Sequence, residues 1–125
     1  MDQGFYGSRI GKGAMAKTVK RYGMVIRLRP EHEEAYRLAH GAVPPDVLRT
    51  IRECNIENYS IFLHNSVLFG YFEYVGSDFS ADMARMAADP ATQRWWVVME
   101  PMQEPFPDRA PGEWWSSMDE VFHTD

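Results

Sequence analysis

The sequence has little cysteine, no long apolar run and fewer basic than acidic residues. Cys54 is the single cysteine in 125 residues, so no intrachain disulfide can form and a cytoplasmic location is expected. No apolar run approaches the roughly 20 residues that cross a bilayer, and the N-terminus lacks the apolar segment of a signal peptide. Lys and Arg number 13 against 18 Asp and Glu, which argues against a nucleic-acid surface. We therefore expect neither a nucleic-acid nor a membrane partner.

The sequence also lacks the common motifs of metal, cofactor and nucleophile sites. Its four histidines, at positions 32, 40, 64 and 123, show neither HxxxH nor HxH spacing, and Cys54 stands alone. There is no GxSxG elbow, no Cys-His signature, no GxGxxG and no phosphate-binding loop. We therefore predict no metal and no cofactor. What remains for chemistry is aromatic surface and a histidine that can exchange protons.

The first 20 residues differ from the rest of the chain. They hold four glycines and four basic residues against a single acidic one. This composition is typical of a flexible extension, and we expect residues 1–20 to lie outside the fold and 21–125 to form one α+β domain.

Hydrophobic periodicity predicts four strands and two helical regions. Alternation from Tyr22 predicts the first strand, and Pro30 followed by acidic residues predicts a helix to about Gly41, resuming over Asp46–Cys54. The later elements are a hairpin of 56–63 and 67–74, a helix capped by Asp78 and running to Ala88, a helix over 91–104, and a strand over 118–123. This order is that of a ferredoxin-like split β-α-β unit. Because such a sheet leaves apolar strand surface exposed, a homodimer is expected.

Two tryptophans lie side by side in the stretch QRWWVVM. The chain has only four tryptophans, and neighbouring side chains on a helix point about 100° apart. Trp95 and Trp96 therefore either bracket the core or line a pocket that needs flat aromatic surface. Indole planes stack on the C–H faces of sugar rings, which suits a carbohydrate pocket, while core packing of a small α+β domain is the alternative that these residues leave open.

Tyr36 and His40 are four residues apart on a predicted helix, so they share one face. A histidine there can transfer protons without a metal, and a phenol beside it can hydrogen-bond a sugar hydroxyl. Half-buried packing of the pair is the alternative that the spacing leaves open.

Four stretches together resemble the L-rhamnose mutarotase family over residues 21–123. They are EEAYRLAH at 33–40, NYSIFL at 58–63, QRWW at 93–96 and DEVF at 119–122. The resemblance implies a dimeric α+β barrel that interconverts the α and β anomers of a 6-deoxy-hexose, most simply L-rhamnose. It also implies that His40 is the acid/base residue, that Tyr36 assists it, and that Tyr36, Tyr59, Trp95 and Trp96 contact the monosaccharide. We accordingly expect at least one of the two tryptophans to form a pocket wall while the other anchors the helix to the sheet.

One position departs from the family pattern. Members usually carry a tryptophan four residues after the histidine, where this chain has Pro44. We therefore expect a pocket that accepts more than one 6-deoxy or related hexose. The alternatives are a mutarotase for another sugar such as L-fucose, and a cofactor-free monooxygenase or a non-catalytic small-molecule binding module on the same barrel.

Overall fold

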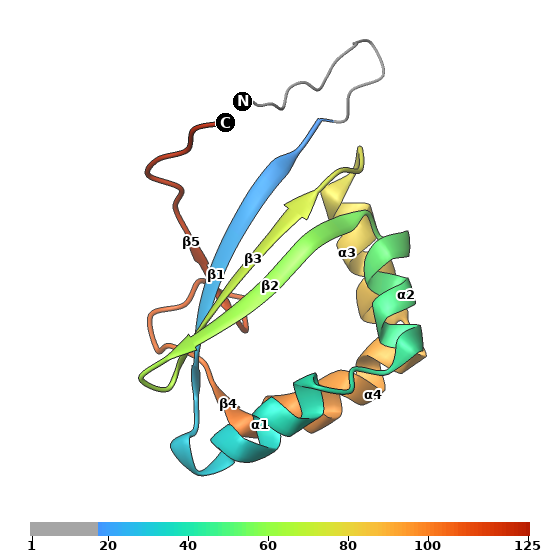
Figure 1. Cartoon of the computed structure of the whole chain (residues 1–125). Coiled ribbons are helices and arrows are strands. Elements are labelled where there is room, and N and C mark those ends of the chain that lie inside the picture. The colour runs from blue at the N-terminus through green and yellow to red at the C-terminus, as the bar shows by residue number, and fades with distance from the viewer. Residues whose placement is uncertain (1–17) are drawn as a thin grey trace.

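The computed structural model describes residues 18–125. Most of the extension expected at 1–20 lies outside the described residues, and the first strand already begins at Lys20. Within the described part the chain folds as one antiparallel sheet with all four α-helices on the same side of it (Figure 1). The predicted α+β fold of split β-α-β type is confirmed by the element order and strand order.

The sheet is built on three long strands, β1 (Lys20–Leu28), β2 (Ile56–His64) and β3 (Val67–Tyr74). Its order is β2-β3-β1-β4, and β3 is antiparallel to both of its neighbours. Two short strands, β4 (Gln103–Glu104) and β5 (Ser116–Met118), pair with different parts of β1. The free edge of β1 is therefore covered by two segments that lie on either side of a loop over 105–115.

The helices follow the local signals that begin and end them. Their bounds are α1 Glu33–His40, α2 Pro45–Glu53, α3 Phe79–Ala88 and α4 Pro90–Met99, with 3₁₀ turns η2 at Pro30–His32 and η3 at Glu100–Met102. Asp78 caps α3 as predicted, because its carboxylate accepts the Ala81 amide at 3.1 Å. Asp89 caps α4 in the same way through the Thr92 amide, at 2.9 Å.

Two boundaries predicted from the sequence are wrong. The helix expected over 91–104 ends at Met99, because Pro101 has no N–H to donate to the preceding turn, and the chain continues as η3 and β4. The strand expected over 118–123 is instead β5 at Ser116–Met118. Val121 and Phe122 pair with no strand in the described chain and are 95% and 79% exposed. Alternation alone predicted a strand over 118–123. In the structure, the pairing of β5 with β1 ends at Gly23 and Met118, and beyond it an Arg21–Glu120 ion pair joins the two segments.

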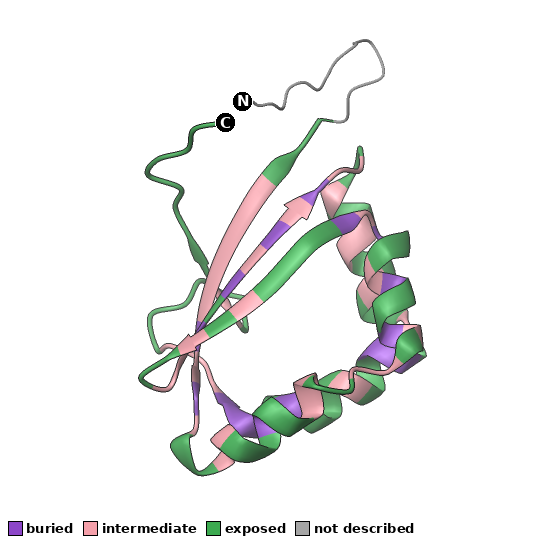
Figure 2. Ribbon diagram, viewed as in Figure 1, coloured by how far each residue is buried: buried purple, intermediate pink, exposed green. Residues whose placement is uncertain are grey.

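Two clusters of buried side chains attach the helices to the sheet. One joins Ile26 and Leu28 of β1 to Tyr36 of α1 and Met99 of α4, and the other joins Ile56, Phe72 and Tyr74. Buried positions in Figure 2 lie where the helices and strands face each other. The clusters occupy opposite ends of the space between sheet and helices, and the cavity described below lies between them.

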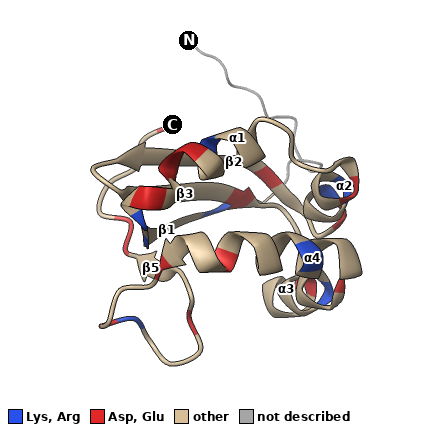
Figure 3. Ribbon diagram, turned by 90° about the horizontal axis from the view of Figure 1, so that it is seen from below, with Lys and Arg blue, Asp and Glu red and all other residues tan. Residues whose placement is uncertain are grey.

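Charges lie mainly on the periphery of the described molecule. Figure 3 shows Lys and Arg scattered among acidic residues, with no single face of the described chain dominated by basic side chains. Among residues 18–125, no helix is both long enough and apolar enough to cross a membrane.

Candidate active site

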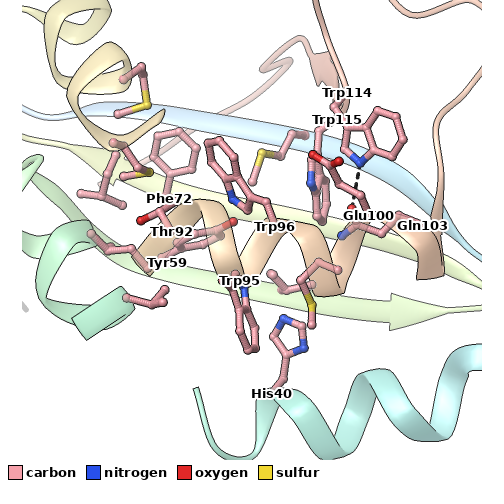
Figure 4. Close-up of a pocket in the computed structure, with 18 of the residues that line it drawn as sticks. His40, Tyr59, Phe72, Thr92, Trp95, Trp96, Glu100, Gln103, Trp114 and Trp115 are labelled. Atoms are coloured by element: carbon pink, nitrogen blue, oxygen red, sulfur yellow. Dashed lines mark hydrogen bonds between the residues drawn. The ribbon is translucent and has the colours of Figure 1, made fainter. Parts of the chain in front are cut away.

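A cavity of about 300 Å³ lies between the sheet and the helices. Its volume is at the lower end of the range for small-molecule pockets. All five residues singled out from the sequence line it: Tyr36, His40, Tyr59, Trp95 and Trp96. Figure 4 shows side chains from α4, β2 and the end of α1 converging on this space. The fold thus brings together residues that are separated by up to 60 positions in sequence.

Helix α1 fixes the relative placement of Tyr36 and His40. Their ring centroids are 4.3 Å apart, and His40 Nδ1 lies 2.9 Å from the Tyr36 carbonyl oxygen. Because a carbonyl oxygen only accepts, Nδ1 carries the hydrogen and donates it. In the neutral ring, Nε2 is then left as a proton acceptor. The backbone of α1 therefore selects the tautomer of the histidine.

Tyr59 reaches the cavity because β2 is irregular. The pairing of β2 with β3 shifts between Glu57 and Ser60, and Asn58 has a φ of 49°, in the left-handed region. The extra residue turns Tyr59 inward, where its ring meets Phe72 at 5.6 Å between centroids. The Asn58 amide donates to Glu73 at 2.7 Å and holds the bulge in place. A two-residue alternation without the bulge would have directed Tyr59 away from the helices.

Trp95 and Trp96 leave α4 in different directions, as expected for neighbours on a helix (Figure 4). Trp95 packs on the core and meets the His40 ring edge-on, at 5.2 Å between centroids. Trp96 is 37% exposed and lines the same cavity. Both indoles are therefore cavity walls, and Trp95 also anchors the helix.

Three polar or aromatic residues at one end of the cavity were not predicted from the sequence. Gln103, Trp114 and Trp115 line it, and Gln103 is 5% exposed. Gln103 donates from Nε2 to the Tyr36 hydroxyl at 3.0 Å and accepts at Oε1 from the Trp114 indole at 2.8 Å. The Trp114-Trp115 pair repeats the pattern of Trp95-Trp96 and was the signal available in the sequence. The polar partner between them could not be inferred, because Gln103 lies in a proline-rich stretch without periodicity.

Glu100 is a further addition to the predicted set. Of the residues that line the cavity within the described chain, it alone carries a carboxylate. Glu100 follows Trp96 by one helical turn, at the end of the cavity that holds Gln103 and Trp114 (Figure 4). It can accept hydrogen bonds from ligand hydroxyls there.

The other end of the cavity is mainly apolar. It is lined by Ile56, Phe72, Met83 and Met86, with Tyr59 and Thr92 beside Phe72 (Figure 4). Met24 packs against Gly70, close to Trp115. Gly70 leaves room for this packing, because a Cβ at that position would lie 2.9 Å from the Met24 methyl carbon. A ligand in the cavity therefore meets polar groups at one end and thioether and aliphatic surface at the other.

A second hollow of about 650 Å³ adjoins the cavity between α2 and β2. It shares His40, Tyr59 and Trp95 with the first and is bordered by Arg52 and Asn58. Pro44 lines neither space, whereas Val43 borders this second one. Among residues 18–125, no three His, Cys, Asp or Glu side chains gather as a metal site would require.

Burial affects the ionisation of Tyr36. The buried environment raises the pKa of its hydroxyl above the usual 10.0, while the hydrogen bond from Gln103 acts in the opposite direction by stabilising the phenolate. At neutral pH Tyr36 is therefore a protonated donor. On the same helix, the neutral form of the His40 ring offers Nε2 as an acceptor. An adjacent donor and acceptor in an aromatic cavity can move protons on a small polar ligand.

Comparison with known proteins gives a consistent match over the same region. The family model described as L-rhamnose mutarotase matches residues 21–124. The chain is 29% identical to an L-rhamnose mutarotase of Oceanobacillus iheyensis, covering 86% of this chain and 100% of the relative. It is 32% identical to an L-rhamnose mutarotase of Opitutus terrae, covering 84% of this chain and 98% of the relative.

Two solved structures have a similar fold. One is the crystal structure of an L-rhamnose mutarotase from Formosa agariphila, with a TM-score of 0.66, 22% identity, and coverage of 85% of this chain and 99% of that one. The other is tetracenomycin F2 cyclase, a type-II polyketide cyclase from Streptomyces glaucescens. Its TM-score is 0.56 at 16% identity, with coverage of 84% of this chain and 95% of that one.

Proposed function

The chain belongs to the L-rhamnose mutarotase family, and we propose that it interconverts the α and β anomers of L-rhamnose by acid–base opening and closing of the sugar ring. One observation carries this mechanism: the His40 and Tyr36 rings lie 4.3 Å apart between centroids and line the same aromatic cavity, and the His40 Nδ1 bond to the backbone leaves Nε2 as the acceptor. Ring opening needs one proton acceptor and one proton donor.

Anomer exchange requires a balanced pair of proton transfers. A base removes the proton of the anomeric hydroxyl while the C1–O5 bond breaks, and an acid protonates O5. The product is the open-chain aldehyde. Rotation about C1–C2 presents the other carbonyl face. As the ring closes, the acid takes its proton back from O5 and the base returns its proton to the oxygen on C1. No electron leaves the sugar, so this chemistry needs no oxidant or reductant.

In the proposed reaction His40 Nε2 takes the proton from the anomeric hydroxyl. The Nδ1–H bond to the Tyr36 carbonyl keeps Nε2 available and steadies the imidazolium that forms. Tyr36 gives its proton to O5. Its raised pKa keeps the hydroxyl protonated at neutral pH. Positioned proton transfer of this kind contributes typically about 10²–10⁴-fold.

The aromatic walls would hold the sugar between them. Trp95, Trp96 and Tyr59 offer flat or edge surface to the C–H groups of the ring, and Glu100 can accept from hydroxyls at the polar end. The C6 methyl group of a 6-deoxy sugar then has the apolar end, near Phe72 and Met83, as its complement.

We also propose that the protein is a homodimer. The helices cover one face of the sheet, and the other face bears Phe62 and Phe69 directly opposite each other, 65% and 39% exposed. Val121 and Phe122 add exposed apolar surface at the C-terminal end. A second copy related by a two-fold axis would cover this surface. A cytoplasmic location is proposed from the single, fully buried cysteine.

Optical rotation tests the proposed activity. Crystalline L-rhamnose of a single anomeric form is dissolved, and the approach of the rotation to equilibrium is followed with and without the protein. We expect a rate proportional to protein concentration. Equal rates with and without protein would reject the function. Repeating the measurement with L-fucose, L-mannose and L-lyxose tests the expectation that Pro44 broadens the specificity.

A further inference from the structure

Three polar groups at the polar end of the cavity, where Gln103 and Trp114 lie, are joined in one series of hydrogen bonds. The Trp114 indole donates to Gln103 Oε1 at 2.8 Å, and Gln103 Nε2 donates to the Tyr36 hydroxyl at 3.0 Å. The two bonds to Gln103 use opposite ends of one buried amide. The donor and acceptor of each bond in this series can therefore be assigned from the groups that can only donate.

The indole N–H has no acceptor capacity, so the Gln103 oxygen must face Trp114. The amide nitrogen then faces Tyr36, and the Tyr36 oxygen must accept from it. A hydroxyl that accepts this bond cannot also donate along the same line. Its own proton is left to point elsewhere, toward the cavity that Tyr36 lines.

Backbone pairing holds both ends of this hydrogen-bonded series against β1. Gln103 of β4 is paired with Leu28 of β1, and the Arg27 guanidinium donates to the Pro105 carbonyl at 2.9 Å. At the other end, β5 pairs with Gly23–Val25 and returns the chain just after Trp115. The loop between them brings Gln103 and Trp114, 11 positions apart, within bonding distance.

We infer that Gln103 is a positioning residue which, oriented by Trp114, holds the Tyr36 hydroxyl so that its proton points at the sugar and stabilises the negative charge left when that proton moves. This inference rests on the proposed function. Two residues outside the predicted site, Gln103 and Trp114, thereby take part in the proposed reaction. The 105–115 loop contributes by orienting the Tyr36 hydroxyl.

Substitutions at Gln103 separate orientation from simple packing. Gln103→Met keeps a similar length and removes both hydrogen bonds. Gln103→Glu keeps a side chain of the same shape, but its carboxylate only accepts, so it draws the Tyr36 proton away from the sugar. We expect exchange at saturating L-rhamnose to fall by about tenfold or more in Gln103→Glu, and by less in Gln103→Met, with a small change in KM.

A double-mutant cycle with Tyr36→Phe tests whether Gln103 acts through the phenol. In the Tyr36→Phe background, Gln103→Glu should change the rate less than about twofold. Trp114→Phe, which frees the amide to turn over, should slow exchange more than Trp115→Phe, which shortens the neighbouring indole in the same loop. Equal losses from Gln103→Glu in both backgrounds would overturn the inference, as would a Gln103→Glu rate equal to that of the unmodified protein.

A spectroscopic readout keeps this test independent of activity. The pKa of Tyr36 can be followed by NMR of ¹³Cζ-labelled tyrosine, with the resonance assigned through Tyr36→Phe. We expect the pKa to rise in Gln103→Met and further in Gln103→Glu, since both lose the donor that stabilises the phenolate. An unchanged pKa in both variants overturns the inference. A protein that exchanges no anomers but shows these shifts overturns the proposed function instead.

Discussion

Replacing His40 by Asn removes the proposed base with little change to its surroundings. The side-chain amide of Asn can place an N–H where His40 Nδ1 lies, 2.9 Å from the Tyr36 carbonyl. It has no atom at the position of Nε2. The substitution therefore keeps the hydrogen bond within α1 and removes the acceptor nitrogen together with the rest of the imidazole ring.

The expected effects on rate and on stability differ in size. Loss of positioned proton transfer should slow anomer exchange by about 10²–10⁴-fold. The fold loses the ring contacts of His40 with Tyr36 and Trp95, each worth about 0.5–1.5 kcal/mol. The free energy of unfolding should therefore fall by no more than about 3 kcal/mol. Sugar affinity should change little, because the aromatic walls remain.

Three measurements on one preparation check these expectations: the exchange rate at saturating L-rhamnose, KM, and urea unfolding. His64→Asn is the matched control, because His64 ends β2 at an exposed position and does not line the cavity. It should exchange anomers at the unmodified rate. The reasoning is refuted if His40→Asn retains more than about a third of the activity while the control behaves as expected.

Three further predictions concern binding, assembly and acid stability. Glu100→Gln should raise KM several-fold with little change in the saturated rate, measured by anomer exchange; an unchanged KM would place Glu100 outside the sugar contacts. Phe62→Lys should shift the protein toward monomer in light scattering, because it puts charge on the exposed sheet face; an unmodified protein already at 14.5 kDa would contradict the dimer. Hydrogen bonds from Tyr74 and Asn55 hold the pKa of Asp82 below its usual 3.8, so the stability they provide is present above pH 3.8 and is lost as the pH falls through the lowered value. The Tm difference between unmodified protein and Asp82→Asn should accordingly shrink in acid, and a difference independent of pH would contradict this.

Short-range sequence patterns were enough to predict much of the fold and some of the side chains that line the cavity. The spacing of Tyr36 and His40, the cap at Asp78 and the hairpin at 64–67 depend on residues within one or two turns of each other. Such features follow from periodicity and side-chain chemistry alone. The last strand did not, because its pairing depends on where the 105–115 loop returns to β1.

Other side chains that line the cavity are placed there by contacts between residues that are distant in sequence. Gln103 meets Tyr36 across 67 positions, and the Asn58 bulge that turns Tyr59 inward is visible only in the register with β3. No short-range pattern carries either arrangement. Pro44 gives the opposite case, since the family pattern suggested a missing wall, yet the position lies outside both cavities. The breadth of specificity remains a prediction that the sugar panel decides.

Two-dimensional exchange NMR of L-rhamnose at anomeric equilibrium tests the central claim most directly. It observes both anomeric protons at once and needs no pure starting anomer. With catalytic amounts of the protein, cross-peaks between the α and β signals should appear at mixing times where the free sugar shows none, and His40→Asn should remove them. Cross-peaks absent with the unmodified protein, or equally strong with His40→Asn, would contradict the assignment of anomer exchange to this cavity.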